Sequence, residues 1–127
     1  MRKTLYVLRR FILKNLVPEI LWPKHIMIDG VHIKIRYTPY SFGIKWLLSR
    51  NHEKYELAER TFIAELSEGD HVLEFGGSIG IVTALIANKV GKRGKIVSVE
   101  ASESIVQYSK SWLEDLGNAS VVQAYAF

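Results

Sequence analysis

The amino-acid sequence predicts an α/β fold with a parallel sheet, and three observations lead to this class. Three short apolar runs, at residues 71–76, 95–100 and 120–125, have the length and composition of buried strands. Helical patterns at about residues 79–90 and 103–116 separate these runs. The connections between strands and helices are short. Because neighbouring parallel strands need a crossover, the alternation predicts a β-α-β-α-β unit with right-handed crossovers.

Residues 1–24 are predicted to form a basic amphipathic helix and a connector. Over residues 3–16 an apolar stripe recurs at steps of three and four, and it consists of Leu5, Leu8, Ile12 and Leu16. The uncharged run is too short to cross a bilayer and lacks a small-residue cleavage site, which argues against a transmembrane helix and a signal peptide. The helix could lie on a membrane surface, or it could pack on the domain or on a partner.

Residues 25–50 are predicted to form a β-hairpin and a linker. Asp29-Gly30 stands between two strand-like runs, His25–Ile28 and Val31–Tyr37, and this pair is a strong signal for a tight hairpin turn. Alternation places Val31 and Ile33 on the face expected to be buried.

Residues 51–127 are predicted to form a nucleotide-binding half-domain that begins with a helix. Asn51 is a plausible N-cap, and the helix runs to about Leu66. Its main apolar stripe is expected to include Tyr55, Phe62 and Leu66, with Ile63 widening it.

Composition narrows the function classes. The net charge of +4 combines a charge of +8 in residues 1–50, which hold ten Lys and Arg against Glu19 and Asp29, with a charge of −4 in residues 51–127. Nucleic acid or an anionic membrane could use that charge, but a solvated basic face explains it equally well, and we do not expect a nucleic-acid partner. Without cysteine the chain has no disulfide and no thiolate metal site, and its four scattered histidines lack metal spacing. A cytoplasmic location fits this composition.

A glycine-rich turn and a distant acid carry the functional signal. The first strand runs through Glu74 into Gly76, Gly77 and Gly80, where a helix starts, so backbone N–H groups can face a polar ligand. Twenty residues later the second strand ends on Glu100. A carboxylate there can accept hydrogen bonds from both ribose hydroxyls, and the sequence therefore predicts an adenosine-type ligand.

The loop favours S-adenosylmethionine over NAD. In a dinucleotide fingerprint the middle glycine would stand at position 78, which is Ser78 here. Glu74, just before the loop, would repel a pyrophosphate but attract a cofactor with ammonium and sulfonium groups. An NAD-binding domain of an oxidoreductase is therefore the weaker alternative.

These segments resemble the FkbM family of S-adenosylmethionine-dependent methyltransferases. That family typically shows an acid, one residue and then Gly-Ala-Asn-Ile-Gly, where this chain has Glu74-Phe75-Gly76-Gly77-Ser78-Ile79-Gly80. Its second strand typically ends in an acid and proline, where this chain has Glu100-Ala101-Ser102. The resemblance implies a Rossmann-like fold and O-methyl transfer. It also implies that the loop supports the methionine part with Glu74 near its amino group, that Glu100 binds the ribose, and that Ala101 and Ser102 border the adenine.

The resemblance also implies that part of the fold is absent. A methyltransferase of this class has about seven strands, and this chain supplies three, so we expect a truncated, cofactor-binding half. The catalytic residues and the acceptor, a small molecule or a glycan-type group, stay unknown. The uncovered edge of the first strand suggests a second chain or a homo-oligomer. A non-catalytic cofactor-binding or interaction fragment is the alternative function.

Overall fold

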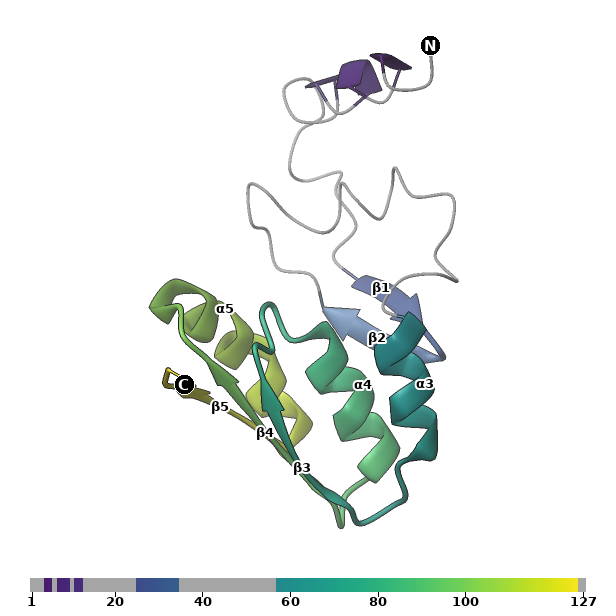
Figure 1. Cartoon of the computed structure of the whole chain (residues 1–127), viewed down its shortest axis with the longest axis vertical. Coiled ribbons are helices and arrows are strands. Elements are labelled where there is room, and N and C mark those ends of the chain that lie inside the picture. Colours follow the sequence, from purple (N-terminus) through teal and green to yellow (C-terminus); the bar gives the residue numbers. More distant parts are fainter. Residues whose placement is uncertain (1–3, 6, 10, 13–24, 35–56, 126–127) are drawn as a thin grey trace. The chain divides into compact units, whose positions relative to one another are not determined.

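The computed structural model describes residues 4–5, 7–9, 11–12, 25–34 and 57–125 (Figure 1). Contacts within the chain divide it into two compact units. One consists of residues 1–26 and 34–55, and the other of residues 27–33 and 56–127. The predicted boundaries at residues 24 and 50 lie outside the described residues and stay predictions.

In the first unit, the described residues between 4 and 12 are helical, in agreement with the helix predicted from residue 3. The predicted connector and linker lie outside the described residues. Among the described helices, none is both long and apolar enough to span a membrane.

The predicted hairpin is confirmed. Strands β1 (His25–Ile28) and β2 (Val31–Lys34) pair around Asp29 and Gly30, whose φ angles are 49° and 76°. Positive φ at both central residues is the geometry of the tight hairpin turn that Asp-Gly favours. Ile28 and Ile33 are buried, as the alternation predicts for Ile33.

The hairpin turn is tied to helix α3 (Leu57–Glu65) by a two-pronged ion pair. Arg60 donates from Nε to Asp29 Oδ2 at 2.8 Å and from Nη2 to Asp29 Oδ1 at 2.5 Å. The hydrogen bonds and charge of the guanidinium lower the pKa of the Asp29 carboxyl below 3.8.

The parallel sheet is confirmed in the second unit. Strands β3 (His71–Phe75), β4 (Lys95–Glu100) and β5 (Ala119–Gln123) pair in that order, all parallel. Helix α4 (Ile81–Val90) joins β3 to β4, and helix α5 (Glu103–Leu113) with the short turn η3 (Glu114–Leu116) joins β4 to β5. Because the strands are parallel, their carboxyl ends and the loops that follow share one edge of the sheet (Figure 1).

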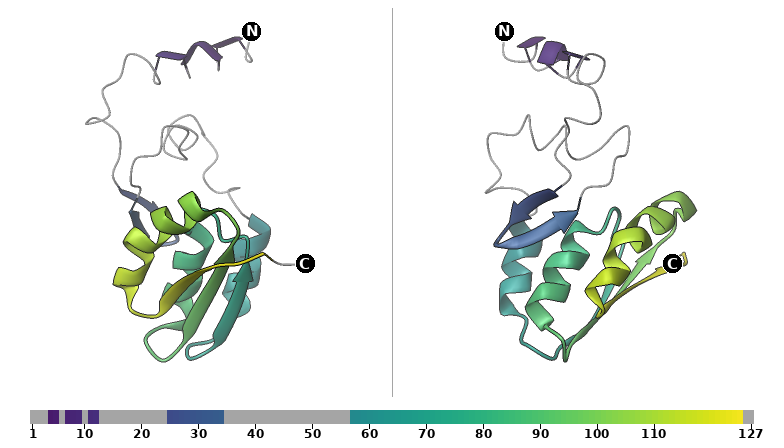
Figure 2. Two further views of the ribbon diagram at one scale, coloured as in Figure 1. Left: turned by 90° about the vertical axis from the view of Figure 1, so that its left-hand side faces the viewer. Right: turned by 180° about the vertical axis from the view of Figure 1, so that it is seen from behind.

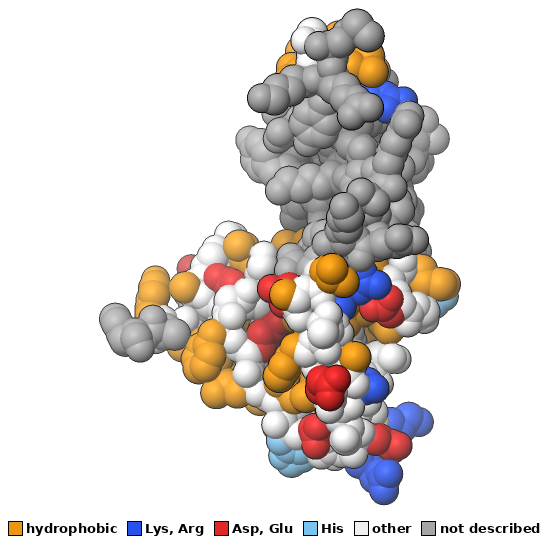
Figure 3. Space-filling model, turned by 45° about the vertical axis from the view of Figure 1, so that its right-hand side comes forward, with side chains coloured by type: hydrophobic (Ala, Val, Ile, Leu, Met, Phe, Trp, Pro, Cys, Tyr) orange, Lys and Arg blue, Asp and Glu red, His pale blue; other side chains and the backbone are white. Residues whose placement is uncertain are grey.

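The helices cover one face of the sheet (Figure 2). On that face the strands bury Ile96, Ser98 and Val121 beneath helices α4 and α5. On the opposite face, Leu73 is 58% and Phe75 61% exposed, and Val122 is also exposed. Figure 3 shows exposed hydrophobic side chains gathered on part of the surface. Within the described residues β3 is an edge strand with one uncovered apolar face.

One element differs from its prediction. The apolar stripe expected on the first helix includes Phe62, but that side chain is 58% exposed, whereas Ile63 is buried. The helix packs on α4 through the face of Arg60 and Ile63, because tertiary contact selects one of two adjoining apolar positions. Asn51 and Tyr55 lie outside the described residues.

Candidate functional site

The glycine-rich loop between β3 and α4 has the tight backbone that its sequence predicts. Gly76, Ser78 and Gly80 have φ angles of 75°, 50° and 94°. Left-handed backbone suits glycine and is unusual for serine. The Gly76 N–H donates to the Val99 carbonyl at 2.7 Å, and the Gly80 N–H to the Gly77 carbonyl at 2.9 Å. The loop thus turns sharply over the end of β4 and leads into α4.

The N-terminus of α4 has neither a side-chain cap nor an acidic residue of its own. Its N-cap, Gly80, provides no side-chain hydrogen bond, and no acidic residue stands in the first turn. The N–H groups of a first helical turn have no acceptors within the helix, and the helix dipole places partial positive charge there. Polar or negatively charged ligand groups can therefore be stabilised at this end.

Glu100 connects the two loops at the carboxyl edge of the sheet. Its Oε2 accepts a hydrogen bond from the Ser78 N–H at 3.0 Å, and its Oε1 accepts one from the Ser102 N–H at 3.1 Å. A carboxylate has about four acceptor positions, so both oxygens retain a lone pair for further donors. A pair of ribose hydroxyls would fit this remaining capacity.

Glu74 reaches the same loop from the neighbouring strand. Its Oε2 accepts a hydrogen bond from Thr83 Oγ1 at 2.5 Å, and Thr83 lies in the first turn of α4. Its register partner on β4 is Ser98. A Cβ atom at Gly77 would lie 2.8 Å from Glu74 Oε2 and 1.9 Å from Ser98 Oγ. Glu100 thus binds the backbone of residues 76–80, and Glu74 lies beside it.

The other predicted residues have different surroundings. Phe75 is exposed on the uncovered face of the sheet, which places its side chain away from the helices. Ile79 is half-buried, and its carbonyl accepts a hydrogen bond from Trp112 Nε1 at 3.1 Å. Ala101 is half-buried, and its carbonyl accepts one from Gln123 Nε2 at 3.4 Å. Their roles toward a ligand stay predictions.

Sequence reasoning missed the residues that support the loop. Thr83, Ser98 and Trp112 were not predicted at the site. Trp112 holds the loop carbonyl, and Leu113 fills the space beside Gly80, where a Cβ would lie 2.5 Å from Leu113 Cδ1. Polar residues in otherwise apolar elements were the available signal for Thr83 and Ser98.

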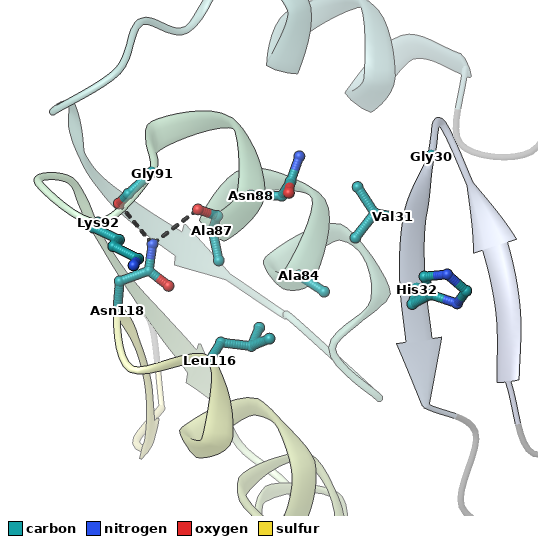
Figure 4. Close-up of a pocket in the computed structure, with 10 residues that line it drawn as sticks. All are labelled: Gly30, Val31, His32, Ala84, Ala87, Asn88, Gly91, Lys92, Leu116 and Asn118. Carbon is teal, nitrogen blue, oxygen red and sulfur yellow. Dashed lines mark hydrogen bonds between the residues drawn. The ribbon is translucent and has the colours of Figure 1, made fainter.

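Two cavities of the second unit lie elsewhere. One, of about 400 Å³, is bounded by the hairpin, α4 and the start of β5 (Figure 4). In it the Asn118 side chain donates to the Ala87 and Gly91 carbonyls at 2.8 and 2.9 Å (Figure 4). The other, of about 220 Å³, lies near Asp29 and Arg60. Within the described part of the chain, no group of three His, Asp or Glu side chains is arranged to hold a metal ion.

Comparison with known proteins decides the family. The family model for protein-L-isoaspartate(D-aspartate) O-methyltransferase matches residues 36–126, which include the glycine loop and Glu100. The chain belongs to this family. It is 33% identical to protein-L-isoaspartate O-methyltransferase 1 of Archaeoglobus fulgidus over 102 residues, or 79% of this chain and 46% of that protein.

Two solved structures share the fold. A protein-L-isoaspartate O-methyltransferase aligns with 98% of this chain and 42% of its own, with a TM-score of 0.53 and 21% identity. Aeropyrum pernix fibrillarin, solved with natively bound S-adenosyl-L-methionine, aligns with 88% of this chain and 44% of its own, with a TM-score of 0.50 and 16% identity. At these identities the likeness describes the fold alone.

Family membership confirms one prediction and corrects another. The class of S-adenosylmethionine-dependent methyltransferases is confirmed, and S-adenosylmethionine is the expected cofactor of the class. The predicted FkbM family is wrong, because the matching family is that of the protein-L-isoaspartate O-methyltransferases. The chain spans about half the length of the curated relatives that it matches.

Proposed function

We propose that this chain carries the cofactor-binding half of a protein-L-isoaspartate O-methyltransferase. The observation that carries the proposal is the family match over residues 36–126, which spans both carboxylates and the glycine loop. Bound S-adenosylmethionine would supply an electrophilic methyl group. The acceptor would be the carboxylate of an L-isoaspartyl or D-aspartyl residue in a protein, the groups that the family is named for.

The residues of this chain fit the cofactor in charge and hydrogen bonding. Glu100 offers acceptors for ribose hydroxyls while its bonds to Ser78 and Ser102 keep its carboxylate in place. Glu74 brings negative charge next to the loop, where an ammonium group is stabilised and a pyrophosphate repelled. The N–H groups at the uncapped N-terminus of α4 can donate hydrogen bonds to the amino-acid carboxylate of the cofactor.

Methyl transfer also requires a held acceptor. The acceptor oxygen must lie in line with the bond that breaks between methyl and sulfur, and fixing this geometry supplies much of the rate enhancement. We propose that the residues that orient the acceptor lie in further polypeptide that covers the exposed face around Leu73 and Phe75 and the edge of β3 that no described strand pairs with. A second chain or a homo-oligomer stays a prediction, as do the cytoplasmic location and membrane contact through residues 3–16.

The proposal is tested in two steps with the full chain. Isothermal calorimetry should detect binding of S-adenosylhomocysteine and no binding of NADH, and Glu100→Gln should weaken the former. Binding of NADH alone would contradict the cofactor assignment. Transfer of labelled methyl from S-adenosylmethionine to an isoaspartyl peptide, with the matching aspartyl peptide as control, then tests turnover. Because the acceptor-orienting residues are proposed to lie in further polypeptide, binding without transfer fits the proposal, and transfer by this chain alone would contradict that placement.

A further inference from the structure

A buried threonine fixes one oxygen of the carboxylate that precedes the glycine loop. Thr83 is 0% exposed, and its hydroxyl donates to Glu74 Oε2 at 2.5 Å. The two residues belong to different elements, because Thr83 lies in the first turn of α4 and Glu74 near the end of strand β3. Threonine is a poor helix former and is buried here among apolar residues, so packing alone does not account for it.

The neighbouring strand confines the same carboxylate. Ser98 pairs with Glu74 in the sheet register and is 1% exposed. Ser98 Oγ and Glu74 Oε2 both lie within 3 Å of the point where a Cβ atom on Gly77 would stand. The carboxylate oxygen therefore sits in a small polar enclosure formed by α4, β4 and the loop backbone.

The other carboxylate oxygen remains available. Within the described part of the chain, the hydrogen bond from Thr83 is the one that Glu74 makes, and it uses Oε2. An ionised carboxylate can accept on both oxygens. Glu74 Oε1 can thus accept a hydrogen bond from a ligand without breaking the contact with α4.

We propose that Thr83 is a positioning residue for the cofactor. Its hydroxyl holds Glu74 through Oε2, so that Oε1 meets the ammonium group of an S-adenosylmethionine-type ligand. The inference rests on the proposed function and deepens it, since it assigns a role to a residue that does not touch the ligand. A carboxylate fixed before binding loses less side-chain freedom when the ammonium arrives, and the interaction is stronger for that reason.

The test separates the amino-acid part of the ligand from its nucleoside part. S-adenosylhomocysteine carries the ammonium group, whereas 5′-methylthioadenosine has the same nucleoside without it. Binding of both is measured by calorimetry for the wild-type chain, Thr83→Val and Thr83→Ser. Valine keeps the shape of threonine without its hydroxyl, and serine keeps the hydroxyl. Circular dichroism and thermal unfolding check that each variant is folded.

We expect Thr83→Val to weaken S-adenosylhomocysteine binding about tenfold, the size expected when a charged hydrogen bond is lost or misplaced. Its affinity for 5′-methylthioadenosine should stay within about twofold, and Thr83→Ser should resemble the wild type. If Thr83→Val weakened the binding of both ligands equally, or changed the affinity for neither, the positioning role would be overturned. If the wild type binds neither ligand, the proposed function itself fails and this inference with it.

Discussion

The close fit between Gly77 and Ser98 gives the sharpest stability prediction. Gly77→Ala would place a Cβ atom 1.9 Å from Ser98 Oγ, 2.8 Å from Glu74 Oε2 and 3.2 Å from Ser98 Cβ. The backbone φ of Gly77 is outside the positive range, so the substitution tests steric contact and not backbone strain. Ser98 is 1% exposed and cannot turn toward solvent.

The expected cost follows from this overlap. Adding a methyl group to a well-packed site costs about 1–3 kcal/mol, and we expect Gly77→Ala to fall in the upper half of that range. Ser98→Ala alone should change stability by less than about 1 kcal/mol, because the hydroxyl makes no hydrogen bond among the described residues that its loss would break. In the double variant the nearest obstacle is gone, and the remaining close atoms are Glu74 Oε2 at 2.8 Å and the Cβ atom of position 98 at 3.2 Å.

Urea unfolding followed by circular dichroism measures the stability of the four proteins of this cycle, which are the wild type, the two single variants and the double variant. The double variant should recover most of the loss caused by Gly77→Ala, with a coupling free energy of about 1–2 kcal/mol. A Gly77→Ala chain as stable as the wild type would refute the packing argument. The argument would also be refuted if Gly77→Ala lowered the stability of the Ser98→Ala variant as much as that of the wild type.

Three further predictions concern other contacts. Asn118→Ala removes two donors from the last carbonyls around the end of α4 and should cost about 1–3 kcal/mol in urea unfolding, whereas the exposed Lys92→Ala should be near neutral. Ser78→Val should lower stability by about 1–2 kcal/mol because a β-branched residue resists the φ of 50°, whereas Ser78→Asn should be tolerated; equal effects would contradict the backbone argument. The pKa of Asp29 is lowered by Arg60, so its contribution is present above pH 3.8 and is lost as pH falls through the lower, folded-state pKa. Since the Asp29 side chain is 51% exposed, the contribution should be less than about 1 kcal/mol, and the stability difference between wild type and Asp29→Asn should shrink between pH 5 and pH 3.

The cofactor class could be predicted from sequence, but the family could not. A glycine loop after one strand and an acid at the end of the next suit the polar groups of a nucleoside ligand, whatever the acceptor of the reaction is. Those positions therefore report on the cofactor and say little about the acceptor. The FkbM resemblance rested on them and was wrong. The alanine that the FkbM family typically has at the position of Gly77 would clash in this chain, because Ser98 Oγ occupies the space of its Cβ atom.

By itself, the sequence determined the local structure. The order of strands and helices, the Asp29-Gly30 turn and the left-handed positions of the glycine loop follow from periodicity and backbone freedom, which act over a few residues. Tertiary structure decided which side chains meet. It buried Ile63 and exposed Phe62, although both are apolar neighbours on one helix. It also joined Thr83 to Glu74 and Trp112 to the loop carbonyl, across 9 and 33 residues. Such contacts depend on how α4 and α5 pack on the sheet, and no local pattern encodes that geometry.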